Sequence, residues 1–327
     1  MTGLVIETRP DHVTPREVVH LRRLGVTKVQ LGLQSMDDRI LELNRRGHTV
    51  EQARQAMRLL RGAGFKIVVH WMANLYGATP ESDYADFQRL WDDPAIRPDE
   101  LKIYPCALLE KTELYEYWKQ GRYEPYSEEA LIELVARCKT HVPRYCRINR
   151  VFRDFPSPEI LAGTKKTNLR QLVHAYMAQR GMDCQCIRCR EVRYKPVRPS
   201  ELRFQVLTYE TDINRELFLS YVTPADRLVG FLRLSLPHSP DVVPVDEVKE
   251  AAIIREVHVY GPALRIGTDS QGEAQHMGLG RRLIQRARDI ARTEGYRELA
   301  VIAAIGTRAY YRKLRFELGE LYMVQEL

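Results

Sequence analysis

Strand-like apolar runs alternate with helical patterns through the first third of the chain. The runs read as strands at residues 3–8, 26–33, 65–69 and 101–105. Helical segments are predicted from Thr14, from Asp37, over 49–62 and over 80–91. Thr14 is followed by Pro15 and then by Glu17, which is a typical helix start. Apolar strands alternating with helices predict a parallel α/β architecture.

Polar residues follow the ends of these predicted strands. They are Glu7, Arg9, Gln34, Ser35, His70, Asn74, Lys102 and Tyr104. Because the carboxyl ends of parallel strands meet at one edge of a sheet, such residues can line a site there. For each one taken alone, a loop or helix-capping role is the alternative.

The second half of the chain follows a different order. A proline-containing linker at 194–200 precedes antiparallel strand patterns at 202–209, 216–222 and 228–235. A long strand, a glycine loop, a helix ending at Gly295, a strand at 299–304, a short helix at 307–314 and a final strand pair complete the chain. The length of 327 residues also favours more than one domain, since single cores rarely exceed about 250–300 residues.

The glycine loop opens the predicted helix of the second half. Its pattern is Gln-x-x-Gly-x-Gly, formed by Gln275, Gly278, Leu279, Gly280 and Arg281. Glycine lets backbone N–H groups approach an oxyanion closely, and the first helical turn adds unpaired donors and the positive end of its dipole. The loop therefore predicts a pyrophosphate cradle. A glycine-rich helix start of purely steric origin is the alternative.

Three of the six cysteines form a C-x-C-x-x-C cluster, Cys184, Cys186 and Cys189. Thiolates at this spacing can bind one tetrahedral Zn²⁺, and a chance cluster of this density is improbable. We expect a structural zinc ion with His174 as the first candidate for the fourth ligand, and Cys146 or Cys138 as the others. Iron–sulfur ligation is the competing interpretation.

A basic segment lies between the two halves. Its cations are Arg144, Arg147, Arg150, Arg153, Lys165 and Lys166, with Tyr145 and Phe152 interleaved. The net charge of +7 and the pI near 9.0 favour a polyanionic partner, with nucleic acid ahead of anionic lipid. We interpret the segment as an RNA phosphate contact, and a solvated charged surface is the alternative.

The sequence gives no sign of a membrane segment or a secretory signal. No run approaches the ~18 apolar residues of a membrane span, and the first residues lack the charged and apolar regions of a signal peptide. We therefore expect a cytoplasmic protein without a membrane partner.

The glycine loop and its surroundings resemble the acetyl-CoA loop of the GNAT acetyltransferases. The resemblance implies that the backbone of the preceding strand, Glu256, Val257, His258 and Val259, pairs with the pantetheine amides. It also implies that Tyr311 contacts acetyl-CoA and protonates the departing thiolate, with Tyr310 in reserve. Either His258 or Glu256 could act as the base, and we expect at most one of them to face the thioester.

Further segments resemble the radical S-adenosylmethionine family of the Elongator catalytic subunit, whose members modify wobble uridines in tRNA. They are residues 6–11, 30–35, 101–105 and 167–170, and the likeness extends over essentially the whole chain. The implied fold is α/β and α+β, in three parts. These are a partial radical-SAM-type (βα) barrel at 1–142, a basic connector with the zinc site at 143–195 and a GNAT domain at 196–327.

One departure from that family limits the expected chemistry. The family holds a 4Fe–4S cluster with three cysteines on an early barrel loop, whereas the first cysteine here is Cys106. We therefore expect a truncated barrel without the cluster or bound S-adenosylmethionine, and no radical step by this chain.

The resemblance predicts a tRNA uridine acetyltransferase that binds acetyl-CoA and tRNA and transfers or hydrolyses the acetyl group. A homodimer or Elongator-like partners are also expected. The alternatives are a protein lysine N-acetyltransferase and a non-catalytic RNA-binding module.

Overall fold

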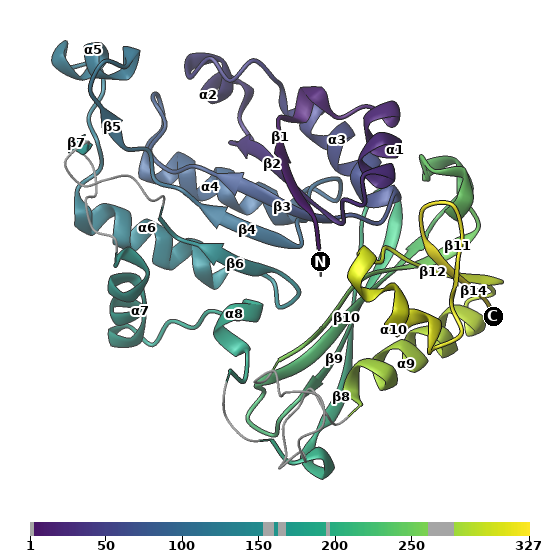
Figure 1. The fold of residues 1–327 in the computed structure, drawn as a ribbon. Coiled ribbons are helices and arrows are strands. Elements are labelled where there is room, and N and C mark those ends of the chain that lie inside the picture. The colour runs from purple at the N-terminus through teal and green to yellow at the C-terminus, as the bar shows by residue number, and fades with distance from the viewer. Residues whose placement is uncertain (1–2, 153–159, 163–167, 194–196, 261–277) are drawn as a thin grey trace.

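The computed structural model describes residues 3–152, 160–162, 168–193, 197–260 and 278–327. Within them the chain forms two large sheets that lie side by side (Figure 1). One is five-stranded, in the order β1-β2-β3-β4-β6, and the other is seven-stranded, in the order β13-β14-β12-β11-β10-β9-β8. No helix in these ranges is long and apolar enough to cross a bilayer.

The first sheet is parallel throughout, as the alternating pattern predicted. Its strands are β1 Val5–Thr8, β2 Lys28–Gln34, β3 Lys66–Trp71, β4 Glu100–Ile103 and β6 Arg147–Arg150. The helices connected to them are α1 Pro15–Arg23, α2 Asp38–Leu43, α3 Val50–Gly62, α4 Pro80–Asp92 and α6 Glu128–Thr140. The α/β architecture of this half is confirmed.

Side-chain caps fix where these helices begin. The Thr14 hydroxyl accepts a hydrogen bond from the Glu17 amide at 3.2 Å, as the sequence predicted. Thr49 forms a capping box with Gln52, in which each side chain bonds the backbone of the other. Each cap satisfies amides that would otherwise lack partners in the first turn.

The second sheet is antiparallel except for one pair. Its strands are β8 Arg203–Glu210, β9 Asn214–Val222, β10 Leu228–Pro237, β11 Ala251–Val259, β12 Glu298–Val301, β13 Glu317–Leu318 and β14 Met323–Glu326. Only β11 and β12 run parallel. The helix α9 Leu279–Thr293 packs its apolar face, including Leu283 and Ala287, on this sheet, and α10 Arg308–Arg312 follows β12.

A connecting region joins the two sheets. It contains α7 Leu169–Gln179 and α8 Ile187–Arg190, whereas α5 Glu113–Lys119 lies between β4 and β6 in the first half, where β5 Leu108–Leu109 pairs with β7 Ile160–Ala162 (Figure 1). The Ile187 amide donates to the carbonyl of Cys146, and the Val192 amide donates to that of Leu228, both at 2.9 Å. The α8 segment is therefore bonded to both halves of the chain.

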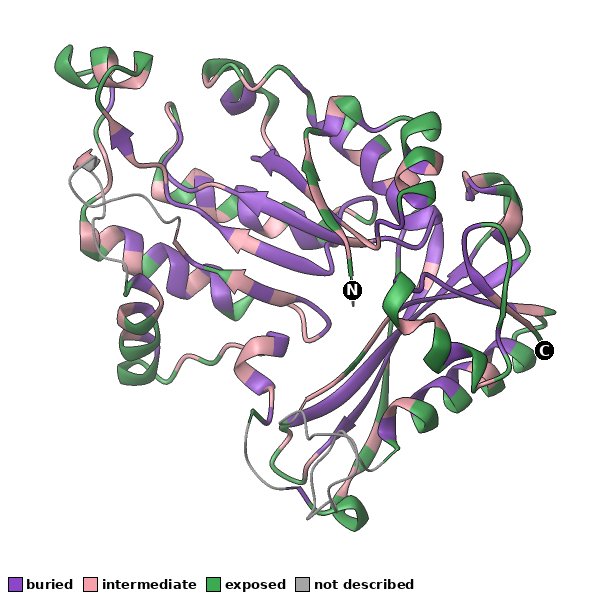
Figure 2. Ribbon diagram, viewed as in Figure 1, coloured by how far each residue is buried: buried purple, intermediate pink, exposed green. Residues whose placement is uncertain are grey.

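The core consists of two hydrophobic clusters, and the two halves share one of them. Figure 2 shows buried residues continuing from the first sheet into the second. One cluster contains Phe65 and Ile67 of the first half together with Phe218, Ile253 and Tyr322 of the second. At Gly64, which has φ +77°, an added Cβ would lie 2.8 Å from Ile253. A glycine there permits the close approach of the two halves.

A buried ion pair crosses the same interface. The Arg255 guanidinium donates to both Asp99 carboxylate oxygens, at 2.6 and 2.8 Å, and both side chains are fully buried. Arg255 also donates to Glu216, and Arg233 lies 3.5 Å from Asp99. Burial alone would raise the pKa of Asp99, but the charges of Arg255 and Arg233 outweigh it and hold that pKa far below its usual value.

A β-bulge in β11 allows this contact. Arg233 of β10 pairs with Glu256, and the next residue, Leu234, pairs with Ile254, so Arg255 has no partner position on β10. A bulged residue changes the direction of the side chains around it. Arg255 and its neighbour Glu256 consequently both contact the first half of the chain.

We predict that Asp99→Asn destabilises the protein by about 3–5 kcal/mol, because it leaves the buried Arg255 charge without its carboxylate. Urea unfolding followed by circular dichroism measures the effect. The matched control is Glu201→Gln, which removes an exposed pair with Arg198 and is expected to cost about 0–1 kcal/mol. Equal effects of the two substitutions would contradict a structural role for the buried pair.

Candidate functional site

Strand β11 extends beyond the end of its parallel partner β12. They pair only over Ala251–Ile254 and Glu298–Val301, whereas β11 continues to Val259. A cavity of about 200 Å³ lies beside the part of β11 that continues past the end of β12. Its lining includes Glu256, His258, Thr307 and Tyr311 from the second half and Lys66 from the first. We call this space the fork cavity.

The helix α9 begins beside the fork. Its N-cap is Gly278, with φ +66°, and Leu279 is buried in the core of the second half. At Gly280, an added Cβ would lie 2.9 Å from the Tyr310 hydroxyl and 4.0 Å from Val259 of β11. The first turn of α9 is therefore close to both β11 and Tyr310, and Arg281 is exposed there. Gln275 lies outside the described residues.

The two predicted tyrosines face different spaces. Tyr311 is 8% exposed and lines the fork cavity, whereas Tyr310 is 42% exposed and lies against Gly280. Burial raises the pKa of Tyr311, so its phenol keeps its proton at neutral pH. Tyr311 can therefore donate a proton into the fork cavity, as a general acid must.

Glu256 and His258 both line the fork cavity, so our expectation that at most one would face it is wrong. They are two positions apart, and alternate residues of a strand share a face. Burial would raise the pKa of Glu256, but Lys66, 2.6 Å away, and Arg233, 3.0 Å away, lower it to about 2. Burial lowers the pKa of His258, so the imidazole is neutral and can accept a proton.

Lys66 is a site residue that sequence reasoning missed. It begins β3 in the first half, yet its ammonium bonds Glu256, which is 190 positions later in the chain. It also lies 3.4 Å from Glu100, which pairs with Lys28 at the start of β2. No local pattern marks such a residue, since its role depends on the contact between the two halves.

The predicted metal ligands come together. The sulfur atoms of Cys184, Cys186 and Cys189 all lie within 4.8 Å of one another. Tetrahedral Zn²⁺ with bonds of about 2.3 Å needs sulfurs about 3.8 Å apart, so the trio fits such an ion with a small contraction. His174, on α7, places Nε2 4.0 Å from the Cys189 sulfur. These four residues could hold a zinc ion.

Two features of the cluster's surroundings favour metal ligation. Burial and the Lys139 charge lower the pKa of His174, and a neutral imidazole is the form that binds a metal. The fully buried Lys139 ammonium lies 3.9 Å from the Cys189 sulfur, where it can stabilise thiolates. Cys138 and Cys146, the other candidate ligands, are buried and do not join the trio.

The basic segment is less open than its sequence suggests. Arg144 pairs with Asp226 at 2.6 Å, and Arg147 donates to Glu191 at 2.7 Å and to the Tyr260 hydroxyl. Arg150 is exposed. Arg153, Lys165 and Lys166 lie outside the described residues. Arg144 and Arg147 thus have intramolecular partners, and RNA contact by the segment stays a prediction.

Polar residues also gather at the carboxyl ends of the parallel strands. The His70 ring nitrogens lie 3.1 Å from Gln30 Oε1 and 3.5 Å from Glu7 Oε1. Gln34, the last residue of β2, and Asn74, which follows β3, have φ of +71° and +62°. Non-glycine residues in this region are uncommon and are enriched at functional sites.

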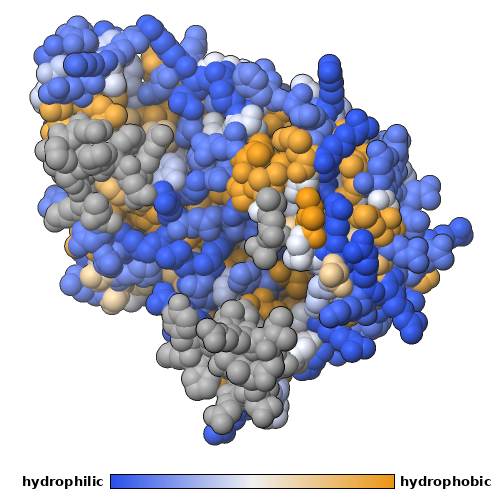
Figure 3. All heavy atoms as spheres, viewed as in Figure 1, coloured by the Kyte–Doolittle hydropathy of each residue, from blue (hydrophilic) through white to orange (hydrophobic). Residues whose placement is uncertain are grey.

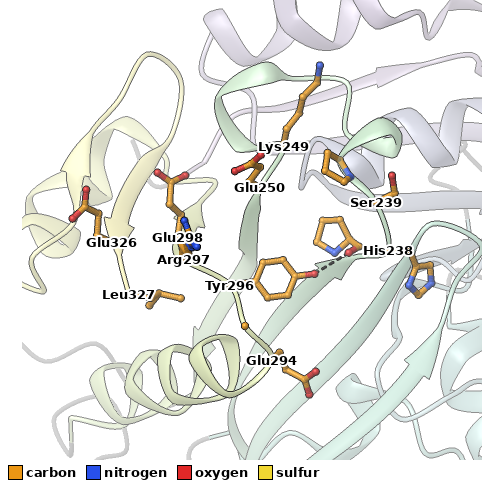
Figure 4. A pocket seen from close by; sticks show the side chains of 13 residues that line it. His238, Ser239, Lys249, Glu250, Glu294, Tyr296, Arg297, Glu298, Glu326 and Leu327 are labelled. Atoms are coloured by element: carbon orange, nitrogen blue, oxygen red, sulfur yellow. Dashed lines mark hydrogen bonds between the residues drawn. The ribbon is translucent and has the colours of Figure 1, made fainter.

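A larger cavity of about 750 Å³ lies at the opposite end of β11 and β12 (Figure 4). Its lining includes Lys249, Glu250, Glu298 and Tyr296, whose hydroxyl donates to the Pro237 carbonyl. It contains none of the predicted site residues. The fork cavity, although smaller, is where the predicted residues meet.

Comparison with known proteins identifies the class of the first half. The Radical SAM superfamily pattern matches residues 2–88, and the Radical_SAM C-terminal domain pattern matches residues 98–179. The chain is 39% identical to the tRNA uridine(34) acetyltransferase of Methanocaldococcus infernus, over 99% of this chain and 62% of that protein. It is 41% identical to the protein of the same name from Dehalococcoides mccartyi, over 99% and 72%.

Two further comparisons define the family. The chain is 40% identical to Elongator complex protein 3 of Danio rerio, over 99% of this chain and 60% of that protein. The solved structure of archaeal Methanocaldococcus infernus Elp3 with an N-terminal deletion (1–46) superposes with a TM-score of 0.92 and 39% identity, covering 100% of this chain and 78% of that one. The chain therefore belongs to the family of tRNA uridine(34) acetyltransferases and Elongator complex protein 3. It spans about three fifths of the length of most of these curated relatives.

We expect the purified chain to hold about one zinc ion and the Cys184→Ser and His174→Ala variants to lose it on dialysis, because each removes a ligand atom. Elemental analysis by mass spectrometry measures the ion. Cys138→Ala is the control and should keep its zinc. If Cys138→Ala loses the ion while His174→Ala retains it, the assignment of the fourth ligand is wrong.

Proposed function

We propose that this chain binds acetyl-CoA in the fork between β11 and β12 and serves the acetyl-transfer part of tRNA wobble-uridine modification. The observation that carries the proposal is the end of β11–β12 pairing at Ile254, beside the start of α9 and the Tyr311 phenol. This arrangement resembles the ligand groove of a GNAT acetyltransferase. Residues 196–327 would form that domain.

The geometry suits each part of acetyl-CoA. The backbone of β11 beyond Ile254 is no longer paired with β12, so it can bond the pantetheine amides. The amides of the first turn of α9, at Leu279, Gly280 and Arg281, suit the pyrophosphate. Gly280 lets the Tyr310 hydroxyl approach this turn, since a Cβ there would lie 2.9 Å from it. The thioester would then lie in the fork cavity near Tyr311.

The residues of the fork cavity can support acyl transfer or hydrolysis. A nucleophile, such as water, loses a proton to the neutral His258 imidazole as it attacks the thioester carbonyl. The carbon–sulfur bond breaks, and the Tyr311 phenol gives its proton to the departing thiolate. Glu256 is not the base in this proposal, because its pairs with Lys66 and Arg233 keep it ionised.

The proposal for tRNA rests on the family and on charge. Relatives that match nearly the whole chain are named for action on tRNA uridine 34, and this chain carries a net charge of +7.

We propose a structural zinc ion at the cysteine cluster, in a connector of residues 143–195 after a radical-SAM-like region at 1–142. The proposal concerns only the acetyl-transfer part of the modification.

Acetyl-CoA hydrolysis measured with and without tRNA tests the proposal. We expect tRNA to alter the rate, and Tyr311→Phe to reduce it by a factor of about 10²–10⁴ without abolishing acetyl-CoA binding, because the variant lacks the proton donor. Tyr310→Phe should have a smaller effect. Free thiol release measures turnover, and calorimetry measures binding.

Tyr296→Phe is the matched control, since it removes a hydroxyl at the opposite cavity. It should retain the wild-type rate. Failure of the zinc-loaded chain to bind acetyl-CoA would refute the proposal. Turnover on a lysine peptide that is indifferent to tRNA would favour a protein acetyltransferase instead.

A further inference from the structure

A cavity of about 540 Å³ adjoins the cysteine cluster, between α7, α8 and the turn from β9 to β10. Five arginines line it: Arg170, Arg188, Arg190, Arg193 and Arg227. Only two carboxylates do so, those of Asp183 and Asp226. We call this space the arginine pocket. Three of its five arginines come from α8 and the residues beside it.

Three of these arginines are held in place without a neutralising partner. Arg170 donates to the Ile148 carbonyl at 3.2 Å, Arg188 to that of Asn149 at 3.5 Å, and Arg227 to that of Cys189 at 2.9 Å. Within the part of the chain that the structure describes, none of the three pairs with a carboxylate. Each guanidinium has five N–H donors, so most of them remain available to a ligand.

Asp226, one of the two carboxylates of the lining, is already engaged. Asp226 pairs with Arg190 of the pocket at 3.1 Å and also with Arg144. A Zn²⁺ ion and the Lys139 ammonium would together balance the charge of the three thiolates. Burial and the charge of Arg188 lower the pKa of Arg170, which shows that like charges are crowded here. A bound anion would relieve that crowding.

We propose that the arginine pocket binds a backbone phosphate of RNA and that the metal site holds the pocket in shape. Guanidinium groups match phosphate oxygens in geometry and charge. The lining contains no Phe, Tyr or Trp on which a base could stack, and its one imidazole, His174, is a candidate metal ligand. We therefore assign the pocket to the phosphodiester and not to a nucleobase. This inference rests on the proposed function, because it takes tRNA as the polyanion.

The link to the metal follows from the chain path. Arg188 lies between the ligands Cys186 and Cys189, and Arg227 bonds the Cys189 backbone from the turn before β10. Loss of the metal would free the cysteine segment and separate these guanidinium groups. Removal of the metal and substitution of the arginines should therefore both reduce RNA affinity, because each disrupts the contact between the pocket arginines and the phosphate.

Binding of fluorescently labelled tRNA to the zinc-loaded chain, measured by anisotropy between 50 and 200 mM salt, tests the inference. We expect the Arg188→Gln, Arg227→Gln double variant to bind on the order of tenfold or more weakly. The slope of log affinity against log salt should shrink by about 0.7–0.9, for the one phosphate contact that is lost. Chelation of zinc should weaken the wild type similarly and add little to the double variant.

Arg180→Gln is the matched control. Arg180 is the C-cap of α7, the helix that carries Arg170 of the pocket. Its guanidinium stacks on Tyr176, and it lies outside the pocket. The variant loses one positive charge, as each substitution of the double variant does, and should retain the wild-type affinity and salt slope. Zinc content and acetyl-CoA binding must be unchanged in every variant, and if the double variant loses zinc, the single Arg227→Gln variant replaces it.

Each remaining outcome is decisive. If the wild type binds tRNA and the double variant binds it equally well, the arginine pocket is not an RNA site, although the proposed function stands. If the wild type does not bind tRNA, the proposed function fails first. If inorganic pyrophosphate binds the wild type but not the double variant and does not displace tRNA, the pocket serves a free phosphate compound and the RNA assignment is wrong.

Discussion

The contact between Arg255 and Asp99 determines how the two halves of this molecule meet. Both side chains are fully buried, and buried charges require partners at close range and in good geometry. The pair therefore fixes β11 against the start of β4. The candidate thioester site depends on this placement, because Lys66 reaches Glu256 only when the two sheets are held together.

The bulge at Arg255 connects the interface to the fork. It directs Arg255 and Glu256 toward the first half, and it occurs directly after Ile254, the last residue of β11 that pairs with β12. A bulge bends its strand and increases the local twist. One local irregularity thus lies at the point where the pairing with β12 ends and also supplies the charges that bind the neighbouring half.

Local sequence patterns predicted the helices and strands well. They did not predict contacts between residues that are far apart in the sequence. Thr14, Thr49 and the cysteine spacing mark a cap, a capping box and a ligand trio, because each depends on residues close in sequence. The pairs Arg147–Glu191 and Lys66–Glu256 join segments that meet only after folding. Our error over Glu256 and His258 came from treating residues two apart on a strand as if they alternated.

The cysteine segment and the ion pair hold the halves together at different points along β10. The segment bonds Leu228 at the start of β10, while Arg233, farther along the strand, joins the Asp99 network. Two separated attachments resist rotation of one half against the other better than a single contact can. A ligand that spans the connector and the fork would then meet surfaces of fixed spacing. A binding surface that is already rigid loses less conformational entropy when its ligand binds. This arrangement therefore favours recognition of a large, stiff partner such as folded RNA.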